Sequence, residues 1–359
     1  MNSPHRQSST LRLPINTSTL PIEDIVDLLK RHCVLTSEEI DAIALWITAS
    51  YLIDSFRVFP KLSLISPEKR CGKTTTMEVI QSVAKDGVLL SSISPASIYR
   101  ITQQFQPTLL IDEADTFVKD GSPELVGIFN SSHTKAGSNV YRCVGDNHQV
   151  ASFNTWMPMV FASIGSLPET LMDRSIVINL RRKKSHESVV RVPVNFEDLQ
   201  KSMRASVLTW CKSNEPVISK STMTVPTVGN DRAEDNWFAL FVIAEALGND
   251  WLQRCEIAFR ALTVPVELEL PTLLLMAIKE YFDHCENARA SSANLVDELC
   301  KDATGPWLEC NNGRRVSQYQ IARLLRNYGI TPSTMRFGES VSRGYDRADF
   351  IDAFERYIP

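Results

Sequence analysis

The sequence predicts an α/β fold, in which helices flank a parallel β-sheet. Three observations predict it. Between residues 61 and 111, short apolar runs alternate with segments of helical periodicity. A lysine-containing loop joins the first of these runs to the helix that follows it. From Asn195 onward the periodicity becomes that of helices, which indicates further helical pieces beyond the sheet.

The composition is that of a globular protein with more than one packed unit. The chain has 359 residues, of which 43% are hydrophobic and 22% charged, so two or three units are expected. Its net charge of −4 excludes a protein that coats nucleic acid along its whole surface. Seven basic and three acidic residues lie between Ser131 and Lys184, so any nucleic-acid contact is expected to be local.

We expect a cytoplasmic protein without membrane contact. The sequence of residues 1–20 lacks the basic and apolar regions of a secretory signal and predicts a flexible tail. The most apolar stretches, Ala42–Leu52 and Leu270–Ile278, are too short to cross a bilayer. The eight cysteines form no CxxC pair and have no histidine at metal-ligand spacing, which favours a reducing compartment.

Two helices are expected before the sheet, within residues 21–57. Apolar positions recur at helical spacing over Ile22–Cys33 and Ser37–Phe56, and Thr36 is of a type that caps the second helix. The core is expected over residues 58–190. Its expected strands are Lys61–Ile65, Val88–Ser91, Thr108–Ile111, Met159–Ala162 and Ile176–Leu180, and its expected helices are Thr74–Ala84 and Pro95–Gln104.

A β-hairpin is expected to interrupt this alternation. Val140–Val144 and Gln149–Phe153 are strand-like runs, and the turn formers Gly145-Asp146-Asn147 join them. After the core, residues 191–290 are expected to form a helical lid or linker. Its expected helices are Phe196–Ser213, Glu234–Leu247, Trp251–Leu262 and Pro271–Cys285.

The last part of the chain, residues 291–359, predicts a winged-helix-like module. Gln318–Tyr328 has the length of a recognition helix, and Met335–Tyr345 has the pattern of a wing. Between Gly305 and Pro359 there are eight arginines and six acidic residues, so the module is mildly basic. Binding to DNA and binding to protein both remain open.

The segment Pro67–Thr74 has the pattern of a phosphate-binding loop. It matches G-x-x-x-x-G-K-[ST] except at the first position, where a proline, which has no N–H to donate, replaces glycine. Gly72 lets backbone N–H groups face phosphates, Lys73 reaches the β- and γ-phosphates, and the Thr74 hydroxyl binds Mg²⁺. A chance match before a helix is the alternative. The expected nucleotide-binding residues are Pro67, Glu68, Lys69, Arg70, Cys71, Gly72, Lys73, Thr74 and Thr75.

A second motif follows downstream, where the apolar run Thr108–Ile111 ends in Asp112-Glu113. Asp112 would hold Mg²⁺ with Thr74, and Glu113 would polarise the water that attacks the γ-phosphate. The alternative, a solvated helix start, does not explain the lysine loop. The two motifs in this order predict an ATPase with a P-loop core of the AAA+ type, which binds ATP and Mg²⁺.

Two further residues have the type and position of catalytic groups. Ser163, at the end of the strand Met159–Ala162, would orient the water, with a strand-end cap as the alternative. Arg174, just before the last core strand, would reach the nucleotide of a neighbouring subunit as an arginine finger. A surface pair between Arg174 and Asp173 is the alternative.

Five segments of the chain resemble a family whose domain is uncharacterised, found as the helicase-like part of phage, plasmid and island primase-helicases. The resemblance covers about Ile40 to Pro359, and in that family a proline at the position of Pro67 is usual. This chain contains no primase half. The segments that carry the resemblance are Leu64–Thr74, Leu110–Asp115, Leu167–Ile176, Asp231–Trp237 and Gly344–Phe350.

The resemblance implies a homo-oligomeric ring, with a hexamer as one candidate size, that moves along single-stranded or forked DNA during replication of a mobile element. A primase or replication initiator would be its partner. In ring helicases a hairpin enters the central pore, and here Val140–Phe153 would do so. The DNA-binding residues would be Lys135, Tyr141, Arg142 and His148. Arg232 would sense the γ-phosphate from the lid.

Two alternatives stay open, and a third is disfavoured. The hairpin can be an ordinary edge hairpin with exposed basic side chains. The protein can be an ATP-gated switch or clamp that controls a protein partner, in phage defence for example, without unwinding DNA. A degenerate P-loop that binds nucleotide only for structure is disfavoured, because Lys73, Thr74, Asp112 and Glu113 are all present.

Overall fold

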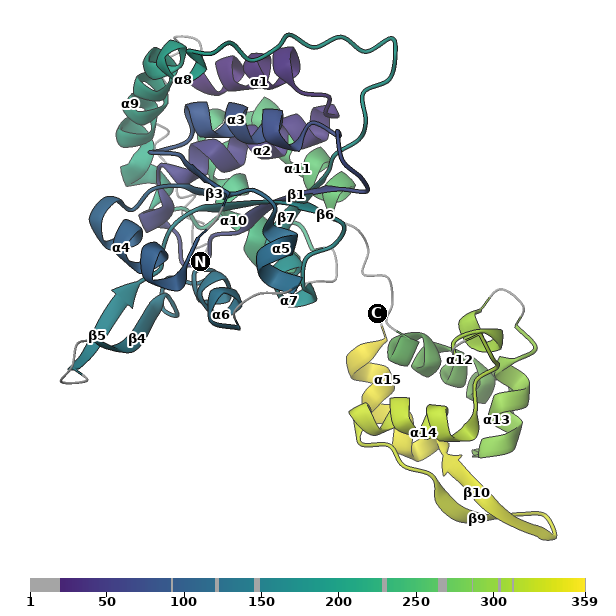
Figure 1. The fold of residues 1–359 in the computed structure, drawn as a ribbon. Helices are drawn as coiled ribbons and strands as arrows, with labels where there is room; N and C mark the ends of the chain where they lie inside the picture. Colours follow the sequence, from purple (N-terminus) through teal and green to yellow (C-terminus); the bar gives the residue numbers. More distant parts are fainter. Residues whose placement is uncertain are drawn as a thin grey trace, which may run out of the picture. The chain divides into compact units, whose positions relative to one another are not determined.

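The computed structural model describes residues 20–91, 93–119, 123–144, 149–227, 231–263, 270–285, 287–302, 305–311 and 313–358. The chain divides into two compact units, Met1–Thr263 and Val264–Pro359 (Figure 1). Helix α12 (Leu270–His284) therefore belongs to the second unit, whereas the sequence analysis placed this segment in the lid.

The first unit is built on a five-stranded parallel sheet, so the predicted α/β fold with a parallel sheet is confirmed. The strand order is β2-β3-β6-β1-β7. All neighbours are parallel, and β1 pairs with β6 on one side and β7 on the other. The strands are β1 (Lys61–Ser66), β2 (Val88–Leu90), β3 (Leu109–Ile111), β6 (Met159–Ile164) and β7 (Ser175–Asn179).

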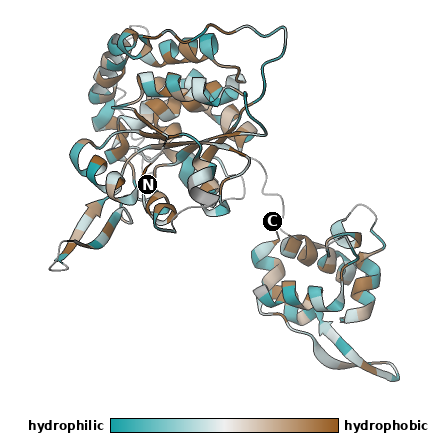
Figure 2. Cartoon of the chain, viewed as in Figure 1, coloured by the Kyte–Doolittle hydropathy of each residue, from teal (hydrophilic) through white to brown (hydrophobic). Residues whose placement is uncertain are grey.

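Apolar side chains cover both faces of the sheet, as a parallel sheet requires. Leu62 and Leu64 of β1, with Leu110 of β3, belong to the cluster that includes α1, α2, α3, α10 and α11. Ile65 and Ile111 belong to the cluster on the other face, which includes α4, α6 and α7. The alternation follows from the two-residue period of a strand. Figure 2 shows the hydrophobic colour along these central strands.

Helices surround the sheet in chain order. The predicted helix Ser37–Phe56 ends at Ser50 and a 3-10 turn follows, because the N–H of Tyr51 bonds to Thr48 rather than four residues back. The predicted Phe196–Ser213 is two helices, and the second continues through Pro216. The helices and the turn are α1 (Pro21–His32), α2 (Ser37–Ser50), η1 (Ile53–Ser55), α3 (Lys73–Val83), α4 (Pro95–Phe105), α5 (Ala114–Lys119), α6 (Pro123–Ser131), α7 (Glu169–Met172), α8 (Phe196–Leu199), α9 (Lys201–Ile218), α10 (Asp231–Leu247) and α11 (Asn249–Leu262).

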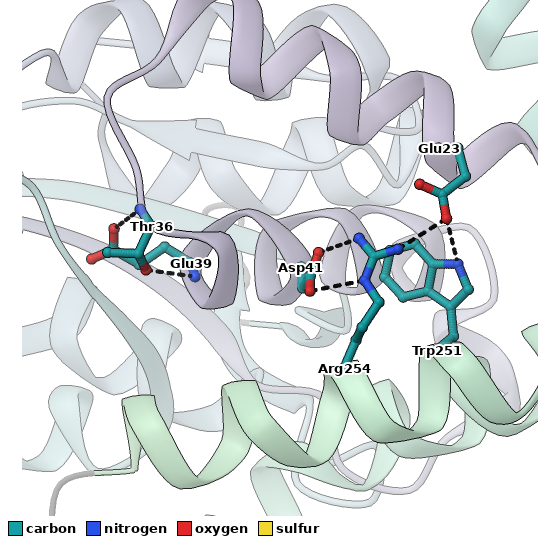
Figure 3. Close-up of polar contacts among 6 residues, drawn as sticks. All are labelled: Glu23, Thr36, Glu39, Asp41, Trp251 and Arg254. Carbon is teal, nitrogen blue, oxygen red and sulfur yellow. Dashed lines mark hydrogen bonds and ion pairs between the residues drawn. The ribbon is translucent and has the colours of Figure 1, made fainter. Parts of the chain in front are cut away.

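The helices predicted as a separate lid pack against the N-terminal helices. Arg254 of α11 donates hydrogen bonds to both carboxylate oxygens of Asp41 on α2 and to Glu23 on α1 (Figure 3). Trp251 donates to the same Glu23 oxygen at 2.9 Å, and the Arg254 guanidinium lies 3.7 Å from the Trp251 ring centroid. Helices α10 and α11 are therefore part of the first unit.

Thr36 begins α2 with the predicted cap. Its hydroxyl accepts a hydrogen bond from the Glu39 N–H at 3.2 Å, and the Glu39 carboxylate accepts one from the Thr36 N–H at 2.8 Å (Figure 3). This reciprocal capping box fixes the start of the helix that carries Asp41.

The second unit contains a three-stranded antiparallel sheet with the order β8-β10-β9. In the sequence, helices α13 and α14 lie between β8 and β9. The predicted helix Gln318–Tyr328 is α14 and a 3-10 turn, and the predicted wing is the hairpin β9–β10. After α12, the elements are β8 (Arg289–Ser291), α13 (Ser292–Leu299), η2 (Pro306–Leu308), α14 (Gln318–Leu325), η3 (Arg326–Tyr328), β9 (Ser333–Phe337), β10 (Ser340–Asp346), η4 (Arg347–Phe350) and α15 (Ile351–Tyr357).

Candidate functional site

The loop between β1 and α3 contains two residues with positive φ. Gly72 has φ +84° and Arg70 has φ +68°, so two residues of the loop are left-handed. Glycine adopts such a conformation without strain, which is why the motif has glycine immediately before the lysine. Residues 67–70 are exposed, whereas Cys71 is buried.

Lys73, the first residue of α3, turns its side chain back toward β1. Its ammonium donates a hydrogen bond to the Ser66 hydroxyl at 2.7 Å, and that hydroxyl donates to the Glu68 carbonyl at 2.9 Å. No side chain of the described residues caps the start of α3. An uncapped helix N-terminus beside a lysine suits an anion such as a phosphate.

The two acidic residues of the second motif follow β3 directly. Asp112 is half-buried, and its carboxylate accepts a hydrogen bond from the Glu113 N–H at 2.8 Å. Glu113 is exposed and has φ +52°, which is unusual for a residue with a side chain. Such strain is common at functional sites.

The sheet brings the loop and the carboxylates to the same edge. Both follow the carboxyl ends of parallel strands, and only β6 lies between β1 and β3. Because strands are spaced about 4.8 Å apart, the two strands are about 10 Å apart across the sheet. This is the edge where ligands bind in open α/β sheets.

Ser163 lies between these two groups but is already hydrogen-bonded. It is beside Ile65 in the sheet, it is fully buried, and its hydroxyl donates to the Gly165 carbonyl at 2.8 Å. This is the contact of a strand-end cap, the alternative reading of Ser163. The neighbouring N–H of Ile164 donates to the Asp115 carboxylate at 3.3 Å, so Asp115 connects α5 to β6.

Arg182 contacts the loop, although it is not among the predicted site residues. Its guanidinium lies 3.2 Å from the Glu68 carboxylate and donates to the Lys69 carbonyl at 3.5 Å. The basic run after β7 was the signal available in the sequence. The pairing of β7 with β1 brings this basic run to the loop. The last bond of that pairing is from the Leu180 N–H to the Ile65 carbonyl.

Arg174 and Arg232 lie at the opposite edge of the sheet. The N–H of Lys61, the first residue of β1, donates to the Arg174 carbonyl, so Arg174 is one strand length from the loop. That length is about 17 Å. The Arg174 guanidinium donates to the Thr170 carbonyl at 2.6 Å, and Asp173 pairs with Arg232 at 3.3 Å rather than with Arg174. The structure does not bring Arg232 to the loop of its own chain.

Two basic residues, Lys61 and His133, are buried next to this opposite edge. Lys61 is 1% exposed, and its ammonium has no hydrogen-bond partner among the described residues. Burial, with the nearby Arg174 charge, lowers the pKa of Lys61 to about 7. Burial also lowers the pKa of His133 to about 3, and the positive charges of Lys61, Arg232 and Arg174 add to that effect.

The predicted hairpin is present as β4 (Asn139–Val144) and β5 (Gln149–Asn154), which project from the sheet (Figure 1). Tyr141 is 63% exposed. Arg142 is paired with Glu124 at 2.9 Å, and Lys135 lies before the hairpin, paired with Asp54 at 3.4 Å. Two of the predicted DNA-binding side chains thus already have partners. His148 lies outside the described residues.

Within the described ranges, no three histidine, cysteine, aspartate or glutamate side chains gather where they could hold a metal ion. In the same ranges, no helix has the length and apolar character needed to span a bilayer.

Two comparisons place the chain beside known sequences. Residues 179–357 match a family model described as a protein of unknown function (DUF3631). The match begins at the last residue of β7, so it includes neither the loop nor the carboxylate pair. The chain is 27% identical over 155 residues to an "Uncharacterized 28.9 kDa protein in xis 5'region" of Saccharopolyspora erythraea. That alignment covers 42% of this chain and 57% of the relative's length.

Proposed function

We propose that this protein is a Mg²⁺-dependent ATPase of the AAA+ type. The observation that carries the proposal is the shared carboxyl edge of the sheet. There, Lys73 at the start of α3 and the Asp112–Glu113 pair after β3 are separated by the width of one strand. A lysine, an uncapped helix start and a carboxylate pair are the groups that bind and cleave a triphosphate.

Each residue of this edge has a role in the proposal. Lys73 exchanges its bond to Ser66 for the β- and γ-phosphates, and the backbone N–H groups from Gly72 onward face the phosphates. Thr74 and Asp112 would hold Mg²⁺, which would supply positive charge to neutralise the phosphates. Glu113 accepts a proton from the attacking water. Its contact with Asp112 is made by its backbone N–H, and its carboxylate is exposed.

We further propose that the active site is completed between subunits of a homo-oligomeric ring. Arg174 is half-buried at the edge of the sheet opposite the loop, where it cannot reach a nucleotide in its own chain. A neighbouring subunit that presents its loop to this edge would place its γ-phosphate near Arg174 and Arg232. Both arginines would therefore act on the neighbour's nucleotide rather than on that of their own chain.

The motor is proposed to act on single-stranded or forked DNA in the cytoplasm, during replication of a mobile genetic element and with a primase or initiator as partner. The projecting hairpin with exposed Tyr141 supports a DNA contact, and the relative named for a position beside xis supports the setting. The second candidate is an ATP-gated switch or clamp without unwinding.

DNA-dependent turnover distinguishes the two candidates. A motor is expected to hydrolyse ATP several-fold faster with single-stranded DNA and to separate a forked duplex. Turnover that is indifferent to DNA, with no strand separation, would favour the switch. The absence of ATP hydrolysis under all these conditions would overturn both.

A further inference from the structure

One face of α14 is lined with unpaired polar and basic side chains. Its buried face is formed by Gln320, Ile321 and Leu325. Tyr319, which is 77% exposed, lies four residues before Arg323 on α14, and Arg326 begins the 3-10 turn η3 that continues the helix. Residues at this spacing share one face of a helix, so these three form an exposed stripe.

The hairpin β9–β10 carries a second stripe. Arg336 is opposite Val341, and Thr334 is opposite Arg343. Side chains that are directly opposite or two residues apart point to the same face of a hairpin, so Arg336 and Arg343 share a face. All four residues are exposed, whereas Met335 and Phe337, which alternate with them, are half-buried. Figure 1 shows the hairpin extending outward from its unit.

The unpaired arginines of this unit are concentrated on these two stripes. Arg289, Arg347 and Arg356 are bound to Asp346, Asp283 and Asp352 at 3.1, 2.6 and 2.7 Å. Within the described residues, none of the stripe arginines has an ion pair. Uncompensated guanidinium groups on a helix and on the hairpin that follows it in the sequence are complementary to a polyanion of regular shape. The stripe arginines are Arg323, Arg326, Arg336 and Arg343.

We propose that the second unit binds duplex DNA as a winged-helix module, with α14 in the major groove and the β9–β10 hairpin against the neighbouring backbone. The order of elements, in which α13 and α14 precede a hairpin, is that of a helix-turn-helix with a wing. An α-helix with side chains is about 10–12 Å wide and the major groove about 12 Å. Arg323 and Tyr319 would face base edges or phosphates, and Arg336 and Arg343 would contact phosphates.

This binding needs no nucleotide, so it stands apart from the proposed ATPase. The test uses the full chain without ATP and a fluorescently labelled mixed-sequence duplex, with anisotropy measured over a range of salt concentrations. The wild type is expected to bind, and its affinity is expected to fall steeply with salt. Arg323→Ala combined with Arg326→Ala is expected to weaken binding about tenfold or more and to reduce the salt slope.

Two control variants keep the result specific. Arg356→Ala removes another exposed arginine of the same unit, one that is paired with Asp352, and it is expected to change the affinity less than about twofold. Lys73→Ala is expected to leave duplex binding unchanged, whatever it does to ATP. Thermal unfolding monitored by circular dichroism checks that the variants are folded.

Three outcomes would overturn the proposal. The first is that the wild type fails to bind duplex DNA at low salt, which would leave a protein partner as the occupant of this face. The second is equal weakening by Arg356→Ala and by the double variant. The third is binding that is lost only when Arg142, in the first unit, is replaced.

Discussion

The ammonium of Lys73 donates a hydrogen bond to the hydroxyl of Ser66 at 2.7 Å, which joins the first residue of α3 to the last residue of β1. The bond holds the lysine over the loop without a charged partner. A phosphate oxygen is a stronger acceptor than a hydroxyl, since both groups are then charged. In the proposed ATPase, an arriving phosphate would therefore replace this bond to a neutral hydroxyl with a bond to a charged oxygen.

Glu113→Gln is expected to separate nucleotide binding from hydrolysis. The amide keeps the size of the side chain but cannot accept the proton of the attacking water, so turnover is expected to fall about a hundredfold or more. Binding of Mg²⁺ and ATP is expected to stay within a few-fold of wild type. Glu256→Gln, on the exposed surface of α11, is the matched control. Equal loss of binding and turnover would contradict the role given to Glu113.

Mixed assemblies test whether Arg174 acts on a neighbour. Arg174→Ala and Glu113→Gln subunits are each expected to be inactive alone. When they are mixed, some interfaces combine the intact Glu113 of one subunit with the intact Arg174 of the next, so part of the ATPase activity is expected to return. Failure to recover activity, in mixtures shown to co-assemble, would argue that Arg174 has no role across the interface.

The buried Lys61 makes stability depend on pH. Its pKa falls from 10.5 in the unfolded chain to about 7 in the folded one, so between these values the unfolded state binds more protons. The free energy of unfolding is therefore expected to rise with pH in that window, by up to about 1.4 kcal/mol per pH unit. Below the window both states are protonated, and this contribution no longer changes.

Lys61→Met is expected to remove this slope and to be more stable than wild type at neutral pH. Urea unfolding of both proteins, from neutral to moderately alkaline pH, measures the difference. The gap between the two is expected to narrow as pH rises, because the neutral amine costs less to bury. Parallel stability curves would contradict the deduction that Lys61 is buried without a partner.

Tyr141 is the hairpin residue whose replacement is expected to affect DNA most specifically. It is exposed, whereas Arg142 next to it is held by Glu124. Tyr141→Ala is expected to reduce stimulation of the ATPase by single-stranded DNA several-fold, since one stacked base contributes about 1–3 kcal/mol. Basal turnover is expected to be unchanged. Undiminished stimulation would remove the hairpin from the DNA contact.

The central strands, the loop and the helix after it were predictable because their signals are local. Each signal spans only a few residues: an apolar run followed by a glycine and a lysine, and another apolar run followed by two acids. The positive φ of Gly72 agrees with the glycine in the motif. Sequence could not predict the conformation of Glu113, because nothing about glutamate favours a left-handed backbone.

The features that could not be predicted from the sequence depend on contacts between distant segments. Asp173 pairs with Arg232 and not with its neighbour Arg174, and only the fold brings the start of α10 beside β7. The placement of Arg182 against the loop likewise depends on which strand pairs with β1. The sequence predicted helices α10 and α11 as part of a separate lid. The Arg254 contacts that join α11 to α1 and α2 link residues more than 200 positions apart, so no local pattern indicates them.

The most direct test of the account is the binding of ATP with Mg²⁺ to the loop, measured by isothermal titration calorimetry on the full chain. We expect wild type to bind with an affinity in the micromolar range and Lys73→Ala to lose at least about tenfold, the factor equivalent to about 1.4 kcal/mol. A wild-type protein that does not bind ATP, or a Lys73→Ala variant that binds as tightly as wild type, would contradict it.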